Sequence, residues 1–305
     1  MRCSLKRWIC KGRDRTLLAL LVSCSSVLVA CSNDRGDEPG GASQASRSLA
    51  QRLEALAEVL KTERGLRDFP SLDAERLARV GDEIVVADVT PPGTDVEFKV
   101  AAHVFELPVE ALFVVVADAA NQTEWIPDLE HSEVLETSEA GLVEHVYQGL
   151  DTTFSTDEWV TRITRNRALF ERTEGRCWEL WWELLEPDRA GEWIERLPED
   201  RRFRSAKRPR SGRGAWLLVP LDATRTYVEY ATTSDIGWRK AVVREFGDGA
   251  LRDMLRGLER AASAAWAEPG PGLLEIADVR GVQSGALAET LREKLVAAGR
   301  DARGE

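Results

Sequence analysis

Side chains that could do acid–base or metal chemistry are few in this sequence. There are three histidines, His103, His131 and His145, and none has a second ligand at the spacing of a histidine-based zinc site. The chain lacks the Gly-x-Ser-x-Gly, His-Glu-x-x-His, phosphate-loop and dinucleotide motifs. His103 and His145 fall in expected strands, where a histidine hydrogen-bonded within a sheet is the more ordinary interpretation. We therefore expect no metal and no cofactor.

The remaining candidates for catalysis are Asp157, Arg162 and Tyr230, but their spacing singles out no catalytic constellation. Cys177 is the only cysteine after residue 31, and no histidine lies near it in the sequence to activate it. We interpret Cys177 as a buried small apolar residue. The sequence thus favours a binding protein over an enzyme.

Composition and charge describe a globular protein with an acidic body. The 305 residues are 43% hydrophobic and 30% charged, which suits one large domain or two small ones. The formal net charge is -11, and it becomes -16 (35 basic against 51 acidic residues) without residues 1–30. Because nucleic-acid affinity comes from neutralising phosphates, we expect no nucleic-acid partner.

Large aromatic side chains are the positive signal for function. Seven of them fall in separate expected elements: Trp125, Trp159, Trp178, Trp182, Trp216, Tyr230 and Trp238. So many large rings would be hard to interdigitate in a filled core, although a solid core is the alternative. An apolar cavity lined by rings, with few polar groups, is what a site for a lipid requires.

Residues 1–30 have the layout of an export signal, with a basic start and an apolar run from Leu17 to Ala30. The run has 14 residues, short of the roughly 20 that span a bilayer, although an uncut transmembrane anchor is the alternative. Leu28-Val-Ala-Cys31 resembles the bacterial lipobox, which implies cleavage before Cys31 and attachment of lipid to it. Ser32 then resembles the sorting pattern for the outer membrane, which implies a lipoprotein anchored at its periplasmic face.

Residues 31–46 are poor in apolar side chains, and we expect a flexible tether. Residues 47–81 predict two helices. Ser48-x-x-Gln51 is a capping box that would start the first, and Gly65 would stop it. One apolar stripe on this helix contains Leu49, Leu53, Leu56 and Leu60. The second helix is expected over residues 72–80.

The middle of the chain predicts mostly strands. They are expected at 84–89, 96–105, 132–137, 142–150 and 156–164, with a helix opened by Pro108 and a short one within 121–129. Asn166 indicates a turn. Residues 177–185 fit a strand or a helix, and the neighbouring strands favour a strand. Residues 186–200 form a polar connection that can hold a short helix. Residues 269–305 are a C-terminal appendage with one expected helix.

Residues 201–213 carry seven positive charges on an otherwise acidic protein. We expect a hairpin here, with Ser211 and Gly212 in its turn. One interpretation is a basic strand face that is solvated or paired with acidic neighbours. The other is a patch for anionic lipid headgroups.

The stretch from residue 214 to 265 predicts two strands followed by a long helix. Gly214–Pro220 is an apolar run, and Thr226–Thr233 is rich in β-branched and aromatic residues. Helical periodicity begins at Trp238. Gly247 and Gly249 interrupt it, each costing about 1 kcal/mol against alanine, so we expect a local weakness there.

This order of elements resembles the StAR-related lipid-transfer (START) family, within the helix-grip superfamily that also contains polyketide cyclases. The matching segments are Gly214–Pro220, Thr226–Tyr230 and Asp235–Trp238, and the likeness extends upstream to about Asp82. It implies a START-like domain over residues 82–268 with an α+β helix-grip fold. In that fold a curved antiparallel sheet wraps around a long C-terminal helix and encloses an apolar cavity.

The resemblance also implies a function: binding, and transfer or sensing, of a lipid or other hydrophobic small molecule. The seven aromatic residues would line the cavity. The family often keeps a charged residue inside the cavity on the strand expected at 201–210, which makes Arg204 a further ligand-binding candidate. The alternative is a cyclase-like or hydrolytic enzyme of the same superfamily.

Overall fold

The computed structural model describes residues 44–66, 68–138, 142–151, 156–203, 206–235 and 240–267. These residues all belong to one compact unit. The expected signal, the lipidation site Cys31 and the C-terminal appendage lie outside the described residues. So do two of the expected ligand-binding residues, Arg204 and Trp238.

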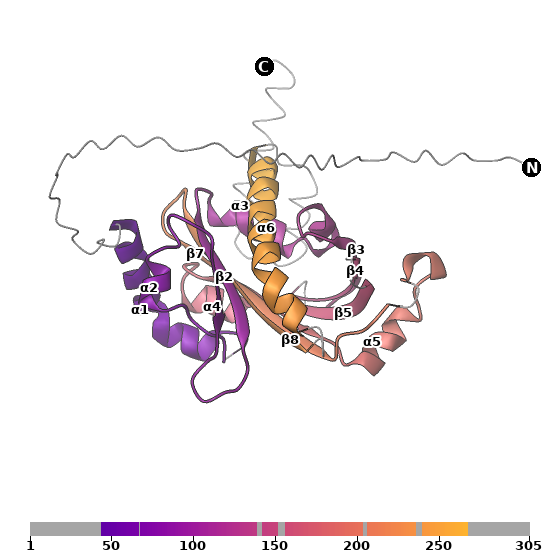
Figure 1. Cartoon of the computed structure of the whole chain (residues 1–305). Coiled ribbons are helices and arrows are strands. Elements are labelled where there is room, and N and C mark those ends of the chain that lie inside the picture. The colour runs from indigo at the N-terminus through magenta and orange to yellow at the C-terminus, as the bar shows by residue number, and fades with distance from the viewer. Residues whose placement is uncertain are drawn as a thin grey trace, which may run out of the picture. The chain divides into compact units, whose positions relative to one another are not determined.

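Eight antiparallel strands form one sheet in the order β1-β2-β8-β7-β6-β5-β4-β3 (Figure 1). The strands are β1 (Val85–Val89), β2 (Phe98–Phe105), β3 (Leu129–Ser138), β4 (Val143–Asp151), β5 (Thr156–Arg165), β6 (Trp178–Leu184), β7 (Ser211–Pro220) and β8 (Thr226–Asp235). The ambiguous segment at 177–185 is therefore a strand, as predicted. With the long C-terminal helix packed against the sheet, the expected α+β helix-grip class is confirmed.

Both faces of the central strands are covered, because side chains alternate between the faces and both sets are apolar. In β7, Trp216 and Leu218 point to one face, and Leu217 and Val219 point to the other. This explains why Gly214–Pro220 reads as a continuous apolar run rather than an alternating one.

One face of the sheet, here called the long-helix face, is covered by α3 (Val109–Ala117) and α6 (Lys240–Ala267) (Figure 1). The 3₁₀ helix η1 (Ala119–Glu124) follows α3 and leads to Trp125. The core of α6 consists of Leu255, Leu258 and Ala262, all fully buried against this face.

The opposite face, here called the N-terminal face, is covered by shorter helices. They are α1 (Gln44–Glu63), α2 (Ala74–Leu77), α4 (Arg167–Arg172) and α5 (Pro187–Ile194). Leu49 and Leu56 of the predicted stripe on α1 are buried there against Leu217 and its neighbours. Helix α5 covers a separate apolar cluster around Tyr147 and Val160.

The predicted start of α1 is wrong. The helix begins at Gln44, so Ser48 lies within it and is not its N-cap. Gln44, Ala45 and Arg47 are good helix formers, which explains why the helix extends toward the N-terminus. The other end is as expected, because α1 stops at Glu63, just before Gly65.

Helix α4 is an element that the sequence pattern does not predict, since Asn166 indicates only a turn. The Asn166 side chain is the N-cap of α4 and accepts a hydrogen bond from the backbone N–H of Leu169 at 3.0 Å. A turn residue and an N-cap have the same sequence signature, because both use a short polar side chain to satisfy backbone N–H groups.

The predicted basic hairpin is also wrong. Ser211 and Gly212 are the first residues of β7 and pair with β8 instead of forming a turn. The preceding described residues hold the short 3₁₀ helix η3 (Glu199–Arg201) and a single bridge between Lys207 and Asp157. Helix α6 runs continuously from Lys240 to Ala267 through Gly247 and Gly249, and the local weakness expected at these glycines stays a prediction.

Among the described residues, every helix is too short or too polar to cross a lipid bilayer.

Candidate functional site

Five of the seven predicted aromatic residues meet on the long-helix face. Trp125, Trp178 and Trp216 are buried in one apolar cluster, and Trp182 and Tyr230 pack against it half-buried. The ring centroids of Trp216 and Tyr230 are 4.3 Å apart, and those of Trp125 and Trp216 are 5.8 Å apart. The sheet therefore brings together rings that are up to 105 positions apart in the chain, from Trp125 to Tyr230.

Strand register explains this gathering. Trp216 on β7 lies directly opposite Tyr230 on β8, and Trp182 on β6 lies opposite Gly214 on β7. A Cβ atom on Gly214 would come within 2.6 Å of the Trp182 ring. Gly214 thus leaves the space that the Trp182 indole occupies, which explains why a glycine stands at the start of the apolar run.

Tyr230 supplies a polar group to this aromatic cluster. Burial raises the pKa of its hydroxyl to about 12, and hydrogen bonds to Thr232 and Trp182 act in the opposite direction. The hydroxyl therefore stays protonated at neutral pH and can donate a hydrogen bond to an apolar molecule with a polar end.

Trp159 lies on the same face but outside the ring cluster. Its indole Nε1 donates to Oε1 of Gln148 at 2.9 Å, and the hydroxyl of Thr161 donates to the same oxygen at 3.1 Å. The network continues from Nε2 of Gln148, which donates to Oε1 of Gln122 at 2.7 Å. Trp159 is therefore held by polar contacts, and the structure does not bring it to the other predicted rings.

A buried ion pair on the long-helix face was missed by the sequence analysis. Arg165 Nη2 donates to Oε1 of Glu144 at 3.2 Å and to the backbone oxygen of Ala117 at 3.1 Å. The two side chains are 3% and 0% exposed. The sequence pattern could have indicated this pair. Glu144 and Arg165 fall on the same side of their strands as the apolar residues Val146 and Ile163, so strand alternation places both charges in the core.

The ion pair is adjacent to the ring cluster. Arg165 lines a small pocket of about 20 Å³ together with Phe113, Phe170 and Trp178. That volume holds roughly one water molecule. The long-helix face thus combines large, closely packed rings with a few buried polar groups. The pocket beside them is far smaller than a site for a lipid, so the predicted ring-lined cavity stays a prediction.

The residues weighed for catalysis do not converge. Arg162 points to the N-terminal face, where its guanidinium lies over the Trp181 ring at 5.7 Å and pairs with Glu183 at 3.5 Å. Tyr230 points to the long-helix face. Asp157 is buried at the bridge to Lys207. The three side chains belong to different environments.

Cys177 is buried, as predicted. Desolvation raises the pKa of its thiol to about 12, so the nucleophilic thiolate is strongly disfavoured at neutral pH. Within the described ranges, no group of three or more histidine, cysteine or carboxylate side chains is arranged to hold a metal ion.

The basic segment pairs with acidic neighbours. Arg201 contacts Glu133 at 2.7 Å, Arg208 contacts Glu158 at 3.0 Å, and Arg213 pairs with Asp68. This is the first of the two interpretations given for residues 201–213, although they are not a hairpin.

This chain belongs to the family described as polyketide cyclase / dehydrase and lipid transport, whose sequence profile matches residues 105–259, just over half of the chain. No curated protein matches it. Among solved structures, it is similar to a STAR-related lipid transfer protein from Xanthomonas axonopodis, at 18% identity over 60% of this chain and 95% of that one, with a TM-score of 0.47.

Two human proteins show the same likeness. StAR-related lipid transfer protein 5 is 15% identical over 72% of this chain and 98% of that one, with a TM-score of 0.47. STARD10 is 12% identical over 82% of this chain and 92% of that one, with a TM-score of 0.49. The family match, together with the eight-stranded antiparallel sheet and the long C-terminal helix, confirms the START-like fold predicted from the order of elements.

Proposed function

We propose that this protein is a bacterial lipoprotein that binds a lipid or similar apolar molecule on the long-helix face and carries it at a membrane. Family membership supports apolar ligand binding. The observation that carries the proposal is the gathering of Trp125, Trp178, Trp182, Trp216 and Tyr230 under α3 and α6.

The polar groups of the same face suit a ligand with one polar end. Tyr230 offers a hydroxyl beside the rings, and Arg165 reaches their edge at Trp178. Such groups orient an apolar molecule, because a buried polar end needs a hydrogen-bond partner. They form no nucleophile–base pair, so we propose that the ligand is bound without being transformed.

The membrane tether in this proposal comes from the sequence. The lipobox at Leu28–Cys31 supports lipid attachment at Cys31, and Ser32 supports the periplasmic face of the outer membrane. Cells expressing the chain should incorporate a labelled fatty acid into it, and Cys31→Ala should abolish the label. Label that persists in the variant would refute the assignment.

Native mass spectrometry of the purified chain tests ligand binding. We expect a co-purified apolar molecule whose occupancy falls in Trp182→Ala. Losing the contact of one ring costs about 1–3 kcal/mol, or roughly 5- to 150-fold in affinity. Trp181→Ala is the matched control, since Trp181 is the next residue on β6 and is also half-buried but faces away.

Two outcomes would contradict the carrier. Equal occupancy in the two variants would place the ligand elsewhere. Turnover of an aromatic polyketide by the purified chain would favour the alternative, a cyclase-like enzyme, which the family description also covers.

A further inference from the structure

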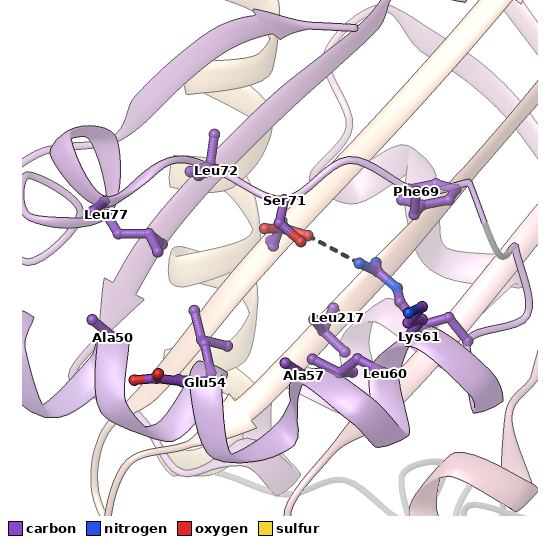
Figure 2. A pocket seen from close by; sticks show the side chains of 14 residues that line it. Ala50, Glu54, Ala57, Leu60, Lys61, Phe69, Ser71, Leu72, Leu77 and Leu217 are labelled. Atoms are coloured by element: carbon purple, nitrogen blue, oxygen red, sulfur yellow. Dashed lines mark hydrogen bonds and ion pairs between the residues drawn. The ribbon is translucent and has the colours of Figure 1, made fainter. Parts of the chain in front are cut away.

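A second pocket lies on the N-terminal face, on the side of the sheet away from α6. It has a volume of about 490 Å³, within the range of small-molecule sites. Its walls come from α1, from α2 and the segment leading into it, and from β7 and β8; Figure 2 shows the side chains that line it. The apolar lining includes Leu53, Ala57, Leu60, Leu72, Leu77 and Leu217.

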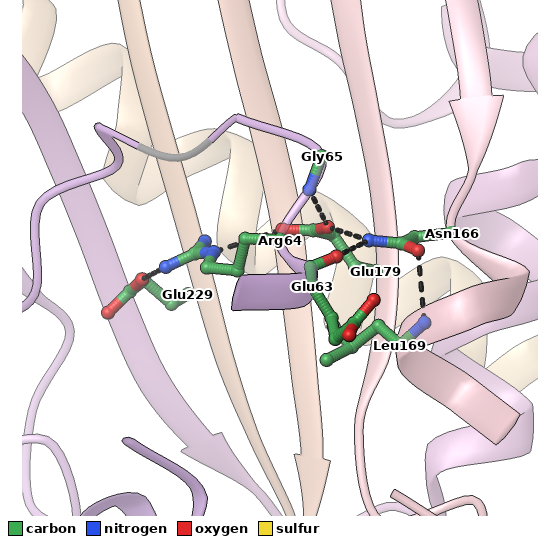
Figure 3. A network of polar contacts seen from close by, with 7 residues as sticks. All are labelled: Glu63, Arg64, Gly65, Asn166, Leu169, Glu179 and Glu229. Atoms are coloured by element: carbon green, nitrogen blue, oxygen red, sulfur yellow. Dashed lines mark hydrogen bonds and ion pairs between the residues drawn. The ribbon is translucent and has the colours of Figure 1, made fainter. Parts of the chain in front are cut away.

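Four charged residues line this pocket: Arg64 and Glu229 are buried, and Glu54 and Lys61 of α1 are exposed. Arg64 follows α1, and its side chain is only 6% exposed. Its Nε donates to Oε1 of Glu179 at 3.0 Å, and its Nη1 contacts Oε1 of Glu229 at 3.4 Å (Figure 3). Burial opposes the charge of Arg64, but the carboxylates of Glu229 and Glu179 outweigh burial and raise its pKa.

The carboxylate oxygens of this network already have donors. The second oxygen of Glu179 accepts from the Gly65 backbone at 2.8 Å and from Asn166 Nδ2 at 2.6 Å (Figure 3). The second oxygen of Glu229 accepts from the Tyr227 hydroxyl at 2.8 Å. The Nη2 of Arg64, by contrast, is buried and meets no hydrogen-bond acceptor among the described residues.

The charges narrow the class of ligand. The two positive and two negative side chains that line the pocket balance, so neither an anion nor a cation gains a net attraction that would offset the loss of its own solvation. In the buried part, Arg64 and the other donors already occupy the carboxylate oxygens of Glu179 and Glu229. The unused group there is one donor, Nη2 of Arg64, and it suits a neutral oxygen acceptor.

We propose that this pocket binds an uncharged small molecule with an apolar body and one hydroxyl or carbonyl oxygen directed at Arg64. The site is distinct from the one on the long-helix face, because the sheet lies between them. Most of its lining residues precede the part of the chain that matches the family, residues 105–259. It is therefore an addition built by the N-terminal helices.

The test uses calorimetric titration of the full-length chain with three eight-carbon probes: octan-1-ol, octanoate and octylammonium. We expect octan-1-ol to bind at least about tenfold more tightly than either charged probe, because it offers Arg64 a neutral acceptor and does not give up the solvation shell of a charge on entering the pocket. Octanoate or octylammonium binding as tightly as octan-1-ol would overturn the assigned ligand class.

Two matched variants locate the binding. Ala57 lines the pocket, so Ala57→Trp fills it. Ala55 lies on the same helix but does not line the pocket, so Ala55→Trp is the matched control. Both alanines are exposed, so neither change disturbs the core. Ala57→Trp should weaken octan-1-ol binding by roughly tenfold or more, and Ala55→Trp should leave it within about twofold. Equal binding by both variants would overturn the site.

A second variant, Ala57→Leu, fills less of the pocket than Ala57→Trp does. Leucine is a good helix former, so Ala57→Leu preserves α1 while reducing the pocket, and it should weaken binding by an intermediate factor. Trp182→Ala distinguishes this proposal from the carrier function. It should change ligand occupancy on the long-helix face and leave octan-1-ol binding at Arg64 unchanged.

Discussion

Single glycines decide how closely the elements of this protein pack. Gly257 lies on α6 where the helix crosses the backbone of Trp125, and a Cβ atom there would collide with the Trp125 carbonyl oxygen. Gly249, two turns earlier on the same helix, faces open space, and a Cβ atom there would have no neighbouring atom within 4 Å. A larger side chain is therefore sterically excluded at Gly257 but can be accommodated at Gly249.

Gly257→Ala should destabilise the protein, because backbone atoms cannot move aside as a flexible side chain can. Overpacking costs about 1–3 kcal/mol and the gain in helix propensity offsets about 1 kcal/mol of that, so a net loss is expected. Gly249→Ala should be neutral or raise the free energy of unfolding by up to about 1 kcal/mol. Denaturant unfolding of both variants measures the difference, and equal stabilities would contradict the close approach.

At the scale of elements, α6 has two differently held parts. Its C-terminal part buries Leu255, Leu258 and Ala262 against the long-helix face. Its N-terminal part is tied to the sheet edge through Asp248, which pairs with Lys99 of β2 at 2.6 Å, and Lys99 also contacts Asp88 of β1 at 2.8 Å. Gly247 and Gly249 flank this aspartate and weaken the helix backbone there, and a partly exposed ion pair holds the helix less firmly than the buried apolar contacts of its C-terminal part.

We therefore expect α6 to open from its N-terminal part when ligand enters. Amides of residues 240–249 should exchange hydrogen faster than those of residues 251–262 in ligand-free protein, and ligand should protect them. Replacing both Gly247 and Gly249 with alanine should slow ligand uptake more than it changes affinity. Hydrogen exchange measures the first expectation; uniform protection along α6, unresponsive to ligand, would place the entrance elsewhere.

At the scale of the whole molecule, all three tyrosines of the chain are buried or half-buried in the sheet. Desolvation raises the pKa of each hydroxyl. The nearby carboxylates of Glu158 and Glu229 raise the pKa of Tyr147 and Tyr227 further, and the pKa of Tyr230 is about 12. Each folded-state pKa lies above the usual value of about 10 in an unfolded chain. Their contribution to stability is complete below a pH of about 10 and is lost as the pH rises through the folded-state values.

Ultraviolet titration of tyrosinate checks this expectation. Folded protein should show little ionisation near a pH of about 10, and the tyrosines should ionise together as the protein unfolds at higher pH. The same chain in denaturant is the control and should titrate at about pH 10. A normal titration in protein that stays folded would contradict the burial of the three hydroxyls.

The sequence alone was sufficient for the order of most elements and for most strands, because alternation and turn residues are local properties, although α4 was not predicted. It also named the five rings that meet, four of which lie at strand positions that alternate onto the long-helix face. Trp159 faces the same way, but its hydrogen bond to Gln148 holds it apart from them. Local pattern failed at Ser48 and at Ser211 and Gly212, where helix propensity and pairing with β8 prevailed over a capping or turn signature.

Other features depended on tertiary structure. The Arg165–Glu144 pair, the Arg64 network and the close approach at Gly257 each join residues that are distant in the chain, and strand register and helix crossing determine which of them meet. Chain order encodes which side chains are available and on which face of a strand they point. Only the assembled sheet decides whether a buried charge finds a partner, because its desolvation cost and the compensating contacts arise together in the packed state.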